Sequence, residues 1–391
     1  MSAPRTQVAM LAMTTVALLA CAPLDTKPTA RTGLRATGRA VEAGQTREAE
    51  TTTPFVLSWP FRMDEPGVEI YQTFGQAQGL SSFSIHEGLD IYASPGTRVF
   101  APISGTIVAM FTEGMKPWTN GFAIRSFVDG KEFITKLLHF EPSTMQFALG
   151  DPVQQGDLLG EIAAWPEDSE FLPHLHIGVG DGQLVVKGNG PGAGNAALLF
   201  AYKANPLKFL ERERDGIPPQ LVAAGAETPF TIRPVEQDSG GNWKRSDTVA
   251  DPNSLSGPID IELSVRDFVP PGTSFALAPQ QVRLTVESLE DSEFTEKRQT
   301  VFAGKLSTAN RFPYSAYVEG PKEHGPDAYF VYHYMSMRPV DESRDASLEP
   351  KPLDTDALRP GRYRITAHAA DLDNDVRLGE MTVRIVGARS R

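Results

Sequence analysis

Apolar side chains between residues 55 and 210 recur in short runs that Gly and Pro residues separate. Within each run they alternate with polar residues or are β-branched, and each run spans about four to eight residues, which is typical of β-strands. A different pattern, NPLKFLERERDG at residues 205–216, predicts a short helix that closes this part of the chain. The expected strands lie within residues 97–111, 121–128, 132–140, 151–165 and 173–180.

A second β-rich region begins near Phe230. Its last two runs, residues 361–372 and 379–387, predict the closing hairpin of a small sandwich. The run YFVYHYMSM at residues 329–337 predicts a buried strand, with a carbohydrate or partner surface as the alternative. The fold class is therefore predicted to be all-β, with domains over residues 54–210 and 229–391, the second an immunoglobulin- or fibronectin-like β-sandwich, joined by a linker over 211–228.

The first 53 residues have a different character. Arg5 precedes an apolar run of 13 residues that is too short to span a bilayer, which predicts a secretory signal peptide over residues 1–20. The run ends in LLAC, which resembles a lipobox and implies a lipidated Cys21; an ordinary signal peptide cleaved near a chance cysteine is the alternative. Residues 21–53 hold no aromatic residue and no apolar periodicity, so they are expected to form a disordered tether.

The tether and the charge of the chain limit its partners. A lipidated cysteine would attach the exported protein to a membrane, and the absence of an acidic residue directly after Cys21 favours the periplasmic face of the outer membrane or the cell surface. The formal net charge of −12 argues against a nucleic-acid partner, because no large basic surface is available to neutralise phosphates.

Four of the seven histidines lie between residues 86 and 176. In PHLHIGV, His174 and His176 leave the same face of a strand. In HEGLD, His86 and Asp90 would lie about 13 Å apart on a straight strand, so one metal can take both only if the chain bends, and Gly88 permits a bend. Two imidazoles and a carboxylate suit Zn²⁺ with an open fourth position. For each histidine taken alone, a hydrogen-bonded core histidine is the alternative.

Several motifs together resemble those of the lysostaphin-type (LytM-domain) zinc metallopeptidases. They are HEGLDIYASPGTRVFAPISGTIVAMF, LLHF, VQQGDLLGEI and PHLHIGV, and the resemblance covers residues 55–210. It implies a duplicated-hybrid-motif-like antiparallel β fold and Zn²⁺ as the cofactor. The sequence departs from the family at two places. Leu137 stands where the family usually has Tyr, and AWPEDSEFLP replaces a Gly/Thr/Ser-rich turn before the final histidines. The second segment is expected to border the substrate groove.

The resemblance also implies a role for each residue of the motifs. His86, Asp90 and His176 would bind zinc, whereas His139 and His174 would flank a water on the metal and the scissile carbonyl. A neutral imidazole near its own pKa can accept the proton of that water and return it to the leaving amine.

The resulting prediction is a zinc-dependent metallo-endopeptidase that hydrolyses peptide cross-links or stem peptides of bacterial peptidoglycan by direct attack of water. A non-catalytic LytM-type domain that binds the cell wall or activates another hydrolase is the main alternative. A lipoyl or biotinyl carrier domain is disfavoured, since no lysine hairpin joins its two half-motifs. The C-terminal region carries no catalytic motif, so His324, His333 and His368 are expected to be structural or solvent-exposed, and a cell-wall or divisome protein is a possible partner of this region.

Overall fold

The computed structural model describes most of the chain after residue 54, and residues 52–391 form one compact unit. The predicted signal peptide, the tether, Cys21 and His324 lie outside the described residues. Among the described residues no helix is long and apolar enough to cross a membrane. The described ranges are 55–62, 67–78, 84–111, 120–167, 169, 171–181, 185–187, 197–199, 202–212, 215–222, 229–270, 274–291, 294–300, 305–307, 317–318, 329–339 and 351–387.

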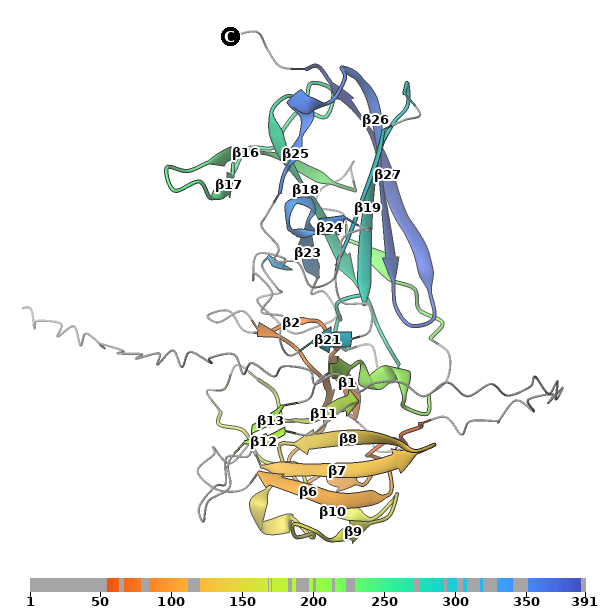
Figure 1. The fold of residues 1–391 in the computed structure, drawn as a ribbon. Coiled ribbons are helices and arrows are strands. Elements are labelled where there is room, and N and C mark those ends of the chain that lie inside the picture. The colour runs from red at the N-terminus through yellow and green to blue at the C-terminus, as the bar shows by residue number, and fades with distance from the viewer. Residues whose placement is uncertain are drawn as a thin grey trace, which may run out of the picture. The chain divides into compact units, whose positions relative to one another are not determined.

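An antiparallel sheet dominates the N-terminal region, and Figure 1 shows three of its strands, β6, β7 and β8, side by side. The strands follow the order β1 (Glu69–Gln72), β4 (Leu89–Tyr92), β11 (His174–Asp181), β8 (Lys131–Leu138), β7 (Gly121–Val128), β6 (Gly105–Phe111) and β9 (Pro152–Val153). At the side, β14 (Tyr202–Ala204) pairs with both β11 and β21 (Lys305–Ser307). Three small pairs complete the region: β5 (Arg98–Phe100) with β10 (Leu158–Glu161), β2 (Ala77–Gln78) with β3 (Ser84–Ile85), and β12 (Val185–Lys187) with β13 (Ala197–Leu199).

The alternation of β11 decides where its histidines point. Leu175, Ile177 and Val179 are at most 1% exposed and belong to the hydrophobic core of the N-terminal region. Because successive side chains of a strand leave opposite faces, His174 and His176 project away from that core. Burial of the three aliphatic side chains therefore fixes the face on which the histidines lie.

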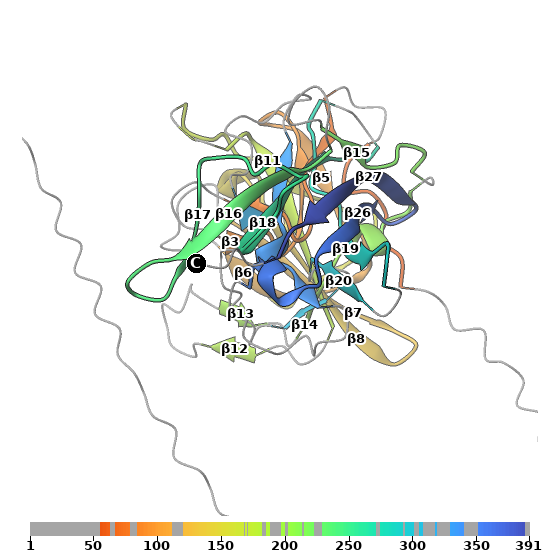
Figure 2. The same cartoon turned by 90° about the horizontal axis from the view of Figure 1, so that it is seen from above.

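The C-terminal region contains two further antiparallel sheets that share one hydrophobic cluster. Figure 2 shows β19, β26 and β27 as neighbours, and β26 and β27 form the predicted closing hairpin. One sheet holds β17 (Trp243–Arg245), β16 (Thr231–Gln237), β18 (Pro258–Arg266), β23 (Phe330–His333) and β22 (Tyr317–Val318), with β15 (Gln220–Leu221) and β25 (Leu353–Asp354) paired to β18. The other holds β24 (Arg338–Pro339), β20 (Thr295–Gln299), β19 (Gln281–Ser288), β26 (Gly361–Ala370) and β27 (Asp375–Ile385). The all-β prediction is confirmed.

The helix predicted over residues 205–216 is wrong. Asn205 accepts a hydrogen bond from the backbone N–H of Leu207, as a helix cap does, but only the 3₁₀ turn Pro206–Lys208 follows. Leu210 then forms a parallel bridge with Leu57, and the N–H of Leu57 donates to the carbonyl of Phe209. Pairing with the start of the domain thus replaces the continuing helical hydrogen bonds. The predicted buried strand at 329–337 is shorter than expected: it contains β23 and then the buried 3₁₀ turn Tyr334–Ser336.

One loop of the C-terminal region packs onto the N-terminal region. We call it the 267–278 loop, and two backbone hydrogen bonds between Asp267 and Leu277 close it. Leu277 and Val269 belong to the hydrophobic core of the N-terminal region. Ser274 donates to the Glu69 carboxylate from its backbone N–H and its hydroxyl, at 2.9 and 2.8 Å.

Candidate metal centre

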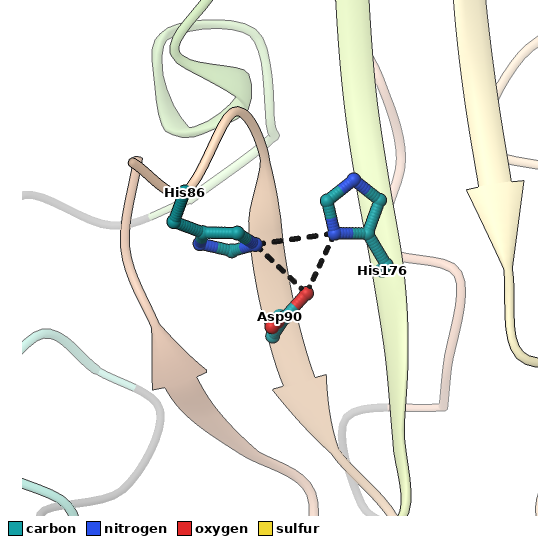
Figure 3. Close-up of side chains that lie close together, drawn as sticks. All are labelled: His86, Asp90 and His176. Carbon is teal, nitrogen blue, oxygen red and sulfur yellow. Dashed lines mark hydrogen bonds and ion pairs between the residues drawn. The ribbon is translucent and has the colours of Figure 1, made fainter. Parts of the chain in front are cut away.

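Three side chains from separate segments converge on the face of the sheet opposite the core. His86 follows β3, Asp90 lies on β4, and His176 lies on β11, whose register places it directly opposite Asp90. His86 Nε2 lies 3.0 Å from Asp90 Oδ1 and 3.1 Å from His176 Nδ1, and the latter two atoms are 2.8 Å apart. Figure 3 shows the two rings and the carboxylate turned toward one another.

This triangle has the dimensions of a metal site. Ligands about 2.0–2.1 Å from a tetrahedral Zn²⁺ lie about 3.3 Å apart, so a small outward movement of each atom would admit the ion. The side chains of His86 and Asp90 are 1% and 2% exposed, and that of His176 is 13% exposed. Three nitrogen and oxygen donors that converge this closely in a buried place fit Zn²⁺, so the residues present suit the implied metal.

Gly88 makes room for the His176 ring. A Cβ atom at Gly88 would lie 2.5 Å from His176 Cε1 and 2.4 Å from the carbonyl oxygen of Ile177. Gly88 does not have the left-handed conformation that only glycine adopts easily. The chain bends at Gly88, as the sequence predicts, and the structure adds a second reason for glycine, the close approach of the His176 ring and the Ile177 carbonyl.

A backbone carbonyl fixes the orientation of His86. Its Nδ1 donates to the carbonyl oxygen of Thr73 at 3.0 Å, which leaves Nε2 unprotonated and directed at the other two ligands. Thr73 is itself held, since its hydroxyl donates to the carbonyl of Ala278 in the 267–278 loop at 3.2 Å. The side-chain oxygen of Gln76 accepts from the N–H of Thr73 and the N–H of Ala278, at 3.2 and 3.5 Å.

Two of the three candidate ligands are deprotonated at neutral pH, which favours metal binding at this site. Burial alone would raise the pKa of Asp90, but His86, His174 and His176 outweigh that effect and hold the pKa well below its usual range. Burial lowers the pKa of His176 to about 4, although the hydrogen bond and charge of Asp90 oppose that shift. At neutral pH the carboxylate is therefore ionised and the His176 imidazole is neutral, which are the forms that bind metals.

His174 and His139 flank the three converging side chains. Nδ1 of His174 donates to the carbonyl oxygen of Leu172 at 2.6 Å, and its Nε2 lies 3.4 Å from Asp90 Oδ2. His139 follows the end of β8, and its ring centre lies 4.5 Å from that of His174 and 6.1 Å from that of His176. Two further imidazoles therefore lie beside the three converging side chains.

The backbone of His139 is strained. Its φ of +80° lies in the left-handed region, where residues other than glycine are uncommon. Its N–H and that of Phe140 both donate to the carbonyl of Asn120, and its own carbonyl accepts from Ala163. Strain of this kind persists only where the surroundings enforce it, and here it turns the ring toward His174.

Trp165 lies against both flanking histidines. Its ring is stacked on that of His174 at 4.9 Å and 26°, and it meets the edge of His139 at 5.1 Å. Phe171 packs against Trp165 at 6.1 Å. The segment AWPEDSEFLP, in which the sequence departs from its resemblance, thus supplies the aromatic border of the site.

A second cluster of possible ligands lies in the C-terminal region, formed by Asp260, Glu262 and His333. His333 Nδ1 lies 2.7 Å from Asp260 Oδ2, and both side chains are at most 1% exposed. Arg245 Nη1 lies 2.7 Å from Glu262 Oε1 and 2.8 Å from His333 Nδ1, and Arg233 also pairs with Glu262 at 2.9 Å. Arginine occupies the place of a cation in this cluster, which is consistent with the structural role predicted for His333.

The structure places the predicted residues together and adds others that the sequence did not indicate. Thr73, Leu172 and Ala278 act through backbone carbonyls, which every residue type carries, so no sequence signal marks them. Trp165 lay in a segment expected to border the substrate, but its ring contacts were not predicted. The five residues brought together are His86, Asp90, His139, His174 and His176.

A protein-family model matches the part of the chain that contains this site. Residues 84–188 match the family model described as Peptidase family M23. Similar solved structures include LytU, at 22% identity, with 32% of this chain and 81% of that chain covered and a TM-score of 0.26. They also include the catalytic domain of the antimicrobial peptidase lysostaphin from Staphylococcus simulans (22% identity, 30% and 84% covered, TM-score 0.25) and that of the prophage-encoded M23 protein EnpA from Enterococcus faecalis (19%, 32% and 88%, 0.25).

Proposed function

We propose that this chain, which contains an M23-type peptidase domain, is a zinc-dependent endopeptidase that hydrolyses peptide cross-links or stem peptides of peptidoglycan. One observation carries the proposal: the potential ligands His86, Asp90 and His176 lie within 3.1 Å of one another, with two further imidazoles beside them. A purely structural zinc site would be closed by four protein ligands, whereas three protein ligands leave a position for water.

The residues divide the chemistry between them. A bound Zn²⁺ would lower the pKa of a water and polarise the scissile carbonyl. His174, oriented by the Leu172 carbonyl, presents an unprotonated Nε2 toward the site and is suited to accept a proton. His139, held in its strained conformation, is suited to contact the carbonyl oxygen or the leaving amine. Trp165 packs on both rings and limits their movement.

The N-terminal residues also suggest where in the cell the protein acts. We propose that Cys21 is lipidated after removal of residues 1–20 and that residues 21–53 tether the enzyme to a membrane, at the periplasmic face of the outer membrane or the cell surface. The apolar run that ends in LLAC supports this. Metabolic labelling with a fatty acid tests it, since a Cys21→Ala variant should lose the label and the protein should otherwise carry it.

Digestion of purified peptidoglycan tests the activity. The protein should release cut peptides, a chelator should abolish release, and added Zn²⁺ should restore it at about one equivalent per chain. Mass spectrometry of the released peptides identifies the bond. Bound zinc without release would contradict the enzymatic proposal and would support a non-catalytic domain that binds the wall or activates another hydrolase.

A further inference from the structure

Lys136 lies beside the metal centre on the same face of the sheet. It is opposite Gly178 on β11 and opposite Ala123 on β7, while His176 is opposite Leu138, two residues further along β8. Because side chains alternate along a strand, Lys136 shares its face with His176. The small neighbours Gly178 and Ala123 leave the lysine side chain free to extend over the sheet.

The Lys136 side chain lies across Gly178, next to His176. A Cβ atom added to Gly178 would be 3.7 Å from His176 Nε2, 3.7 Å from Lys136 Cβ and 3.8 Å from Lys136 Cε. The stem of the lysine therefore runs over the glycine, and its end lies near the imidazole that completes the metal site. Two residues of a strand span about 6.6 Å, so this place corresponds to one or two residues of an extended peptide away from the metal.

The ammonium group is positioned without a direct partner. Within the described part of the chain, Lys136 has no ion pair or hydrogen bond, and the residue is partly exposed. On the same face, Arg125 and Glu132 neutralise each other at 3.0 Å. Burial lowers the pKa of Lys136 and the nearby Asp90 carboxylate raises it, which makes Asp90 the nearby negative charge. The Asp90 carboxylate contacts His86 and His176, at 3.0 and 2.8 Å, and forms no ion pair with Lys136 among the described residues, so the ammonium group can take another anion.

We propose that Lys136 binds a carboxylate of the substrate, on a residue within two positions of the scissile bond. The substrates are then peptides with a free carboxylate at that position, as opposed to the corresponding carboxamides. This inference rests on the proposed function for its reaction, but the binding of the carboxylate is a separate property that zinc-free protein can show.

A matched pair of synthetic cross-link peptides tests the inference. The two differ only in a free carboxylate or a carboxamide on the residue beside the scissile bond. The zinc-loaded protein should cleave the carboxylate peptide with a kcat/KM about tenfold higher, mainly through a lower KM, because a charge-assisted hydrogen bond favours binding by about that factor. Lys136→Gln should remove the preference by slowing cleavage of the carboxylate peptide alone, and Lys136→Arg should retain part of it.

Controls separate this effect from a loss of structure or of zinc. Lys131→Gln, at the exposed start of the same strand, should leave the preference unchanged, and zinc content should remain equal in all variants. Equal cleavage of both peptides by the unsubstituted protein, or an undiminished preference in Lys136→Gln, would overturn the inference. The first comparison needs no variant, so it decides the matter even if Lys136→Gln does not fold.

Calorimetry of both peptides on zinc-depleted protein provides a readout besides activity. The carboxylate peptide should bind more tightly to the unsubstituted protein and equally with its amide to Lys136→Gln. If neither peptide is cleaved by the zinc-loaded protein, the proposed function fails while this measurement still tests Lys136. Equal affinities of the unsubstituted protein for the two peptides would then refute the carboxylate site.

Discussion

The two histidine-carboxylate clusters use the same kinds of ligand and differ in what neutralises them. In the N-terminal region, His86, Asp90 and His176 converge without a cationic side chain in direct contact among the described residues. In the C-terminal region, the guanidinium of Arg245 touches both Glu262 and His333. Spacing and residue type alone do not distinguish a metal site from an ion-pair network. The place of the positive charge does.

Removal of a ligand should produce the largest difference between the clusters. Asp90→Ala should lose zinc and reduce peptidoglycan hydrolysis by more than about 100-fold. Loss of a residue that only orients a ligand typically lowers activity by about 10–100-fold, and loss of a direct ligand should cost more. His139→Ala should lose activity and retain zinc. Activity assays paired with metal analysis measure both.

The matched control lies in the other cluster. Asp260→Asn should leave zinc content and activity unchanged while it lowers the free energy of unfolding by about 3 kcal/mol, because His333 and Arg245 lose a buried carboxylate. Loss of zinc in Asp260→Asn, or equal zinc loss in Asp90→Ala and His139→Ala, would contradict the assignment.

Removal of the arginine should make the second cluster resemble the first. Arg245→Ala leaves Asp260, Glu262 and His333 in place without the guanidinium between them. Bound zinc should then rise from one toward two equivalents at high metal concentration, and unfolding without metal should become easier by about 1–3 kcal/mol. Equilibrium dialysis measures the stoichiometry, and an Arg245→Ala protein that still binds one equivalent would show that the arginine does not exclude the metal.

Acid should weaken the zinc-free protein through the first cluster. Burial lowers the pKa of His176 to about 4, whereas an unfolded histidine titrates near 6.5. Between these values the unfolded chain binds a proton that the folded chain excludes, so stability is complete above about pH 6.5 and falls toward pH 4 by at most about 3 kcal/mol. Below that, protonation of Asp90, whose folded pKa is also lowered, extends the loss.

Urea unfolding in the presence of a chelator at pH 7, 5 and 4 measures this dependence. A His176→Asn variant supplies the control, because it removes the titrating imidazole and should flatten the dependence between pH 6.5 and 4. An unchanged slope in that variant would assign the acid sensitivity to other groups.

The smallest expected effect concerns the backbone. His139 has a φ of +80°, whereas His333 in the second cluster has an extended φ of −115°. His139→Gly should be more stable than His139→Ala by about 1 kcal/mol, since glycine adopts the left-handed region without strain. At His333 the order should reverse by about 0.5–1 kcal/mol. Thermal or urea unfolding of the four variants measures which of the Gly and Ala variants is more stable at each position. If the Ala variant is the more stable one at both positions, the backbone of His139 is not strained.

Much of the fold, and the residues that converge at the candidate site, could be predicted from local patterns and the motif resemblance. The period of two placed His174 and His176 on one face, and the aliphatic residues between them decided which face it was. His86 and Asp90 could be paired only by assuming a bend, which the motif resemblance supported. The roles of these residues as ligands and catalysts remain predictions.

The remainder depended on contacts that sequence patterns do not encode. The helix expected after Asn205 formed only a 3₁₀ turn, because Leu210 pairs with Leu57 from the start of the domain. The orientation of His86 depends on the carbonyl of Thr73, and carbonyls carry no signature. Arg245 is the residue whose presence distinguishes the second cluster from the first. It is distant in sequence from His333, and only the fold brings the two together.

The support of Thr73 by Ala278 has a consequence for the modularity of this protein. Residues 84–188 match the peptidase family, yet the backbone that orients His86 is held by a loop of the other region, 205 residues along the chain from Thr73. A fragment that ends at the linker would contain every expected zinc ligand but would lack the hydrogen bond between Thr73 and Ala278. The smallest part of the chain that keeps His86 oriented is therefore larger than residues 84–188 and includes Ala278 of the 267–278 loop.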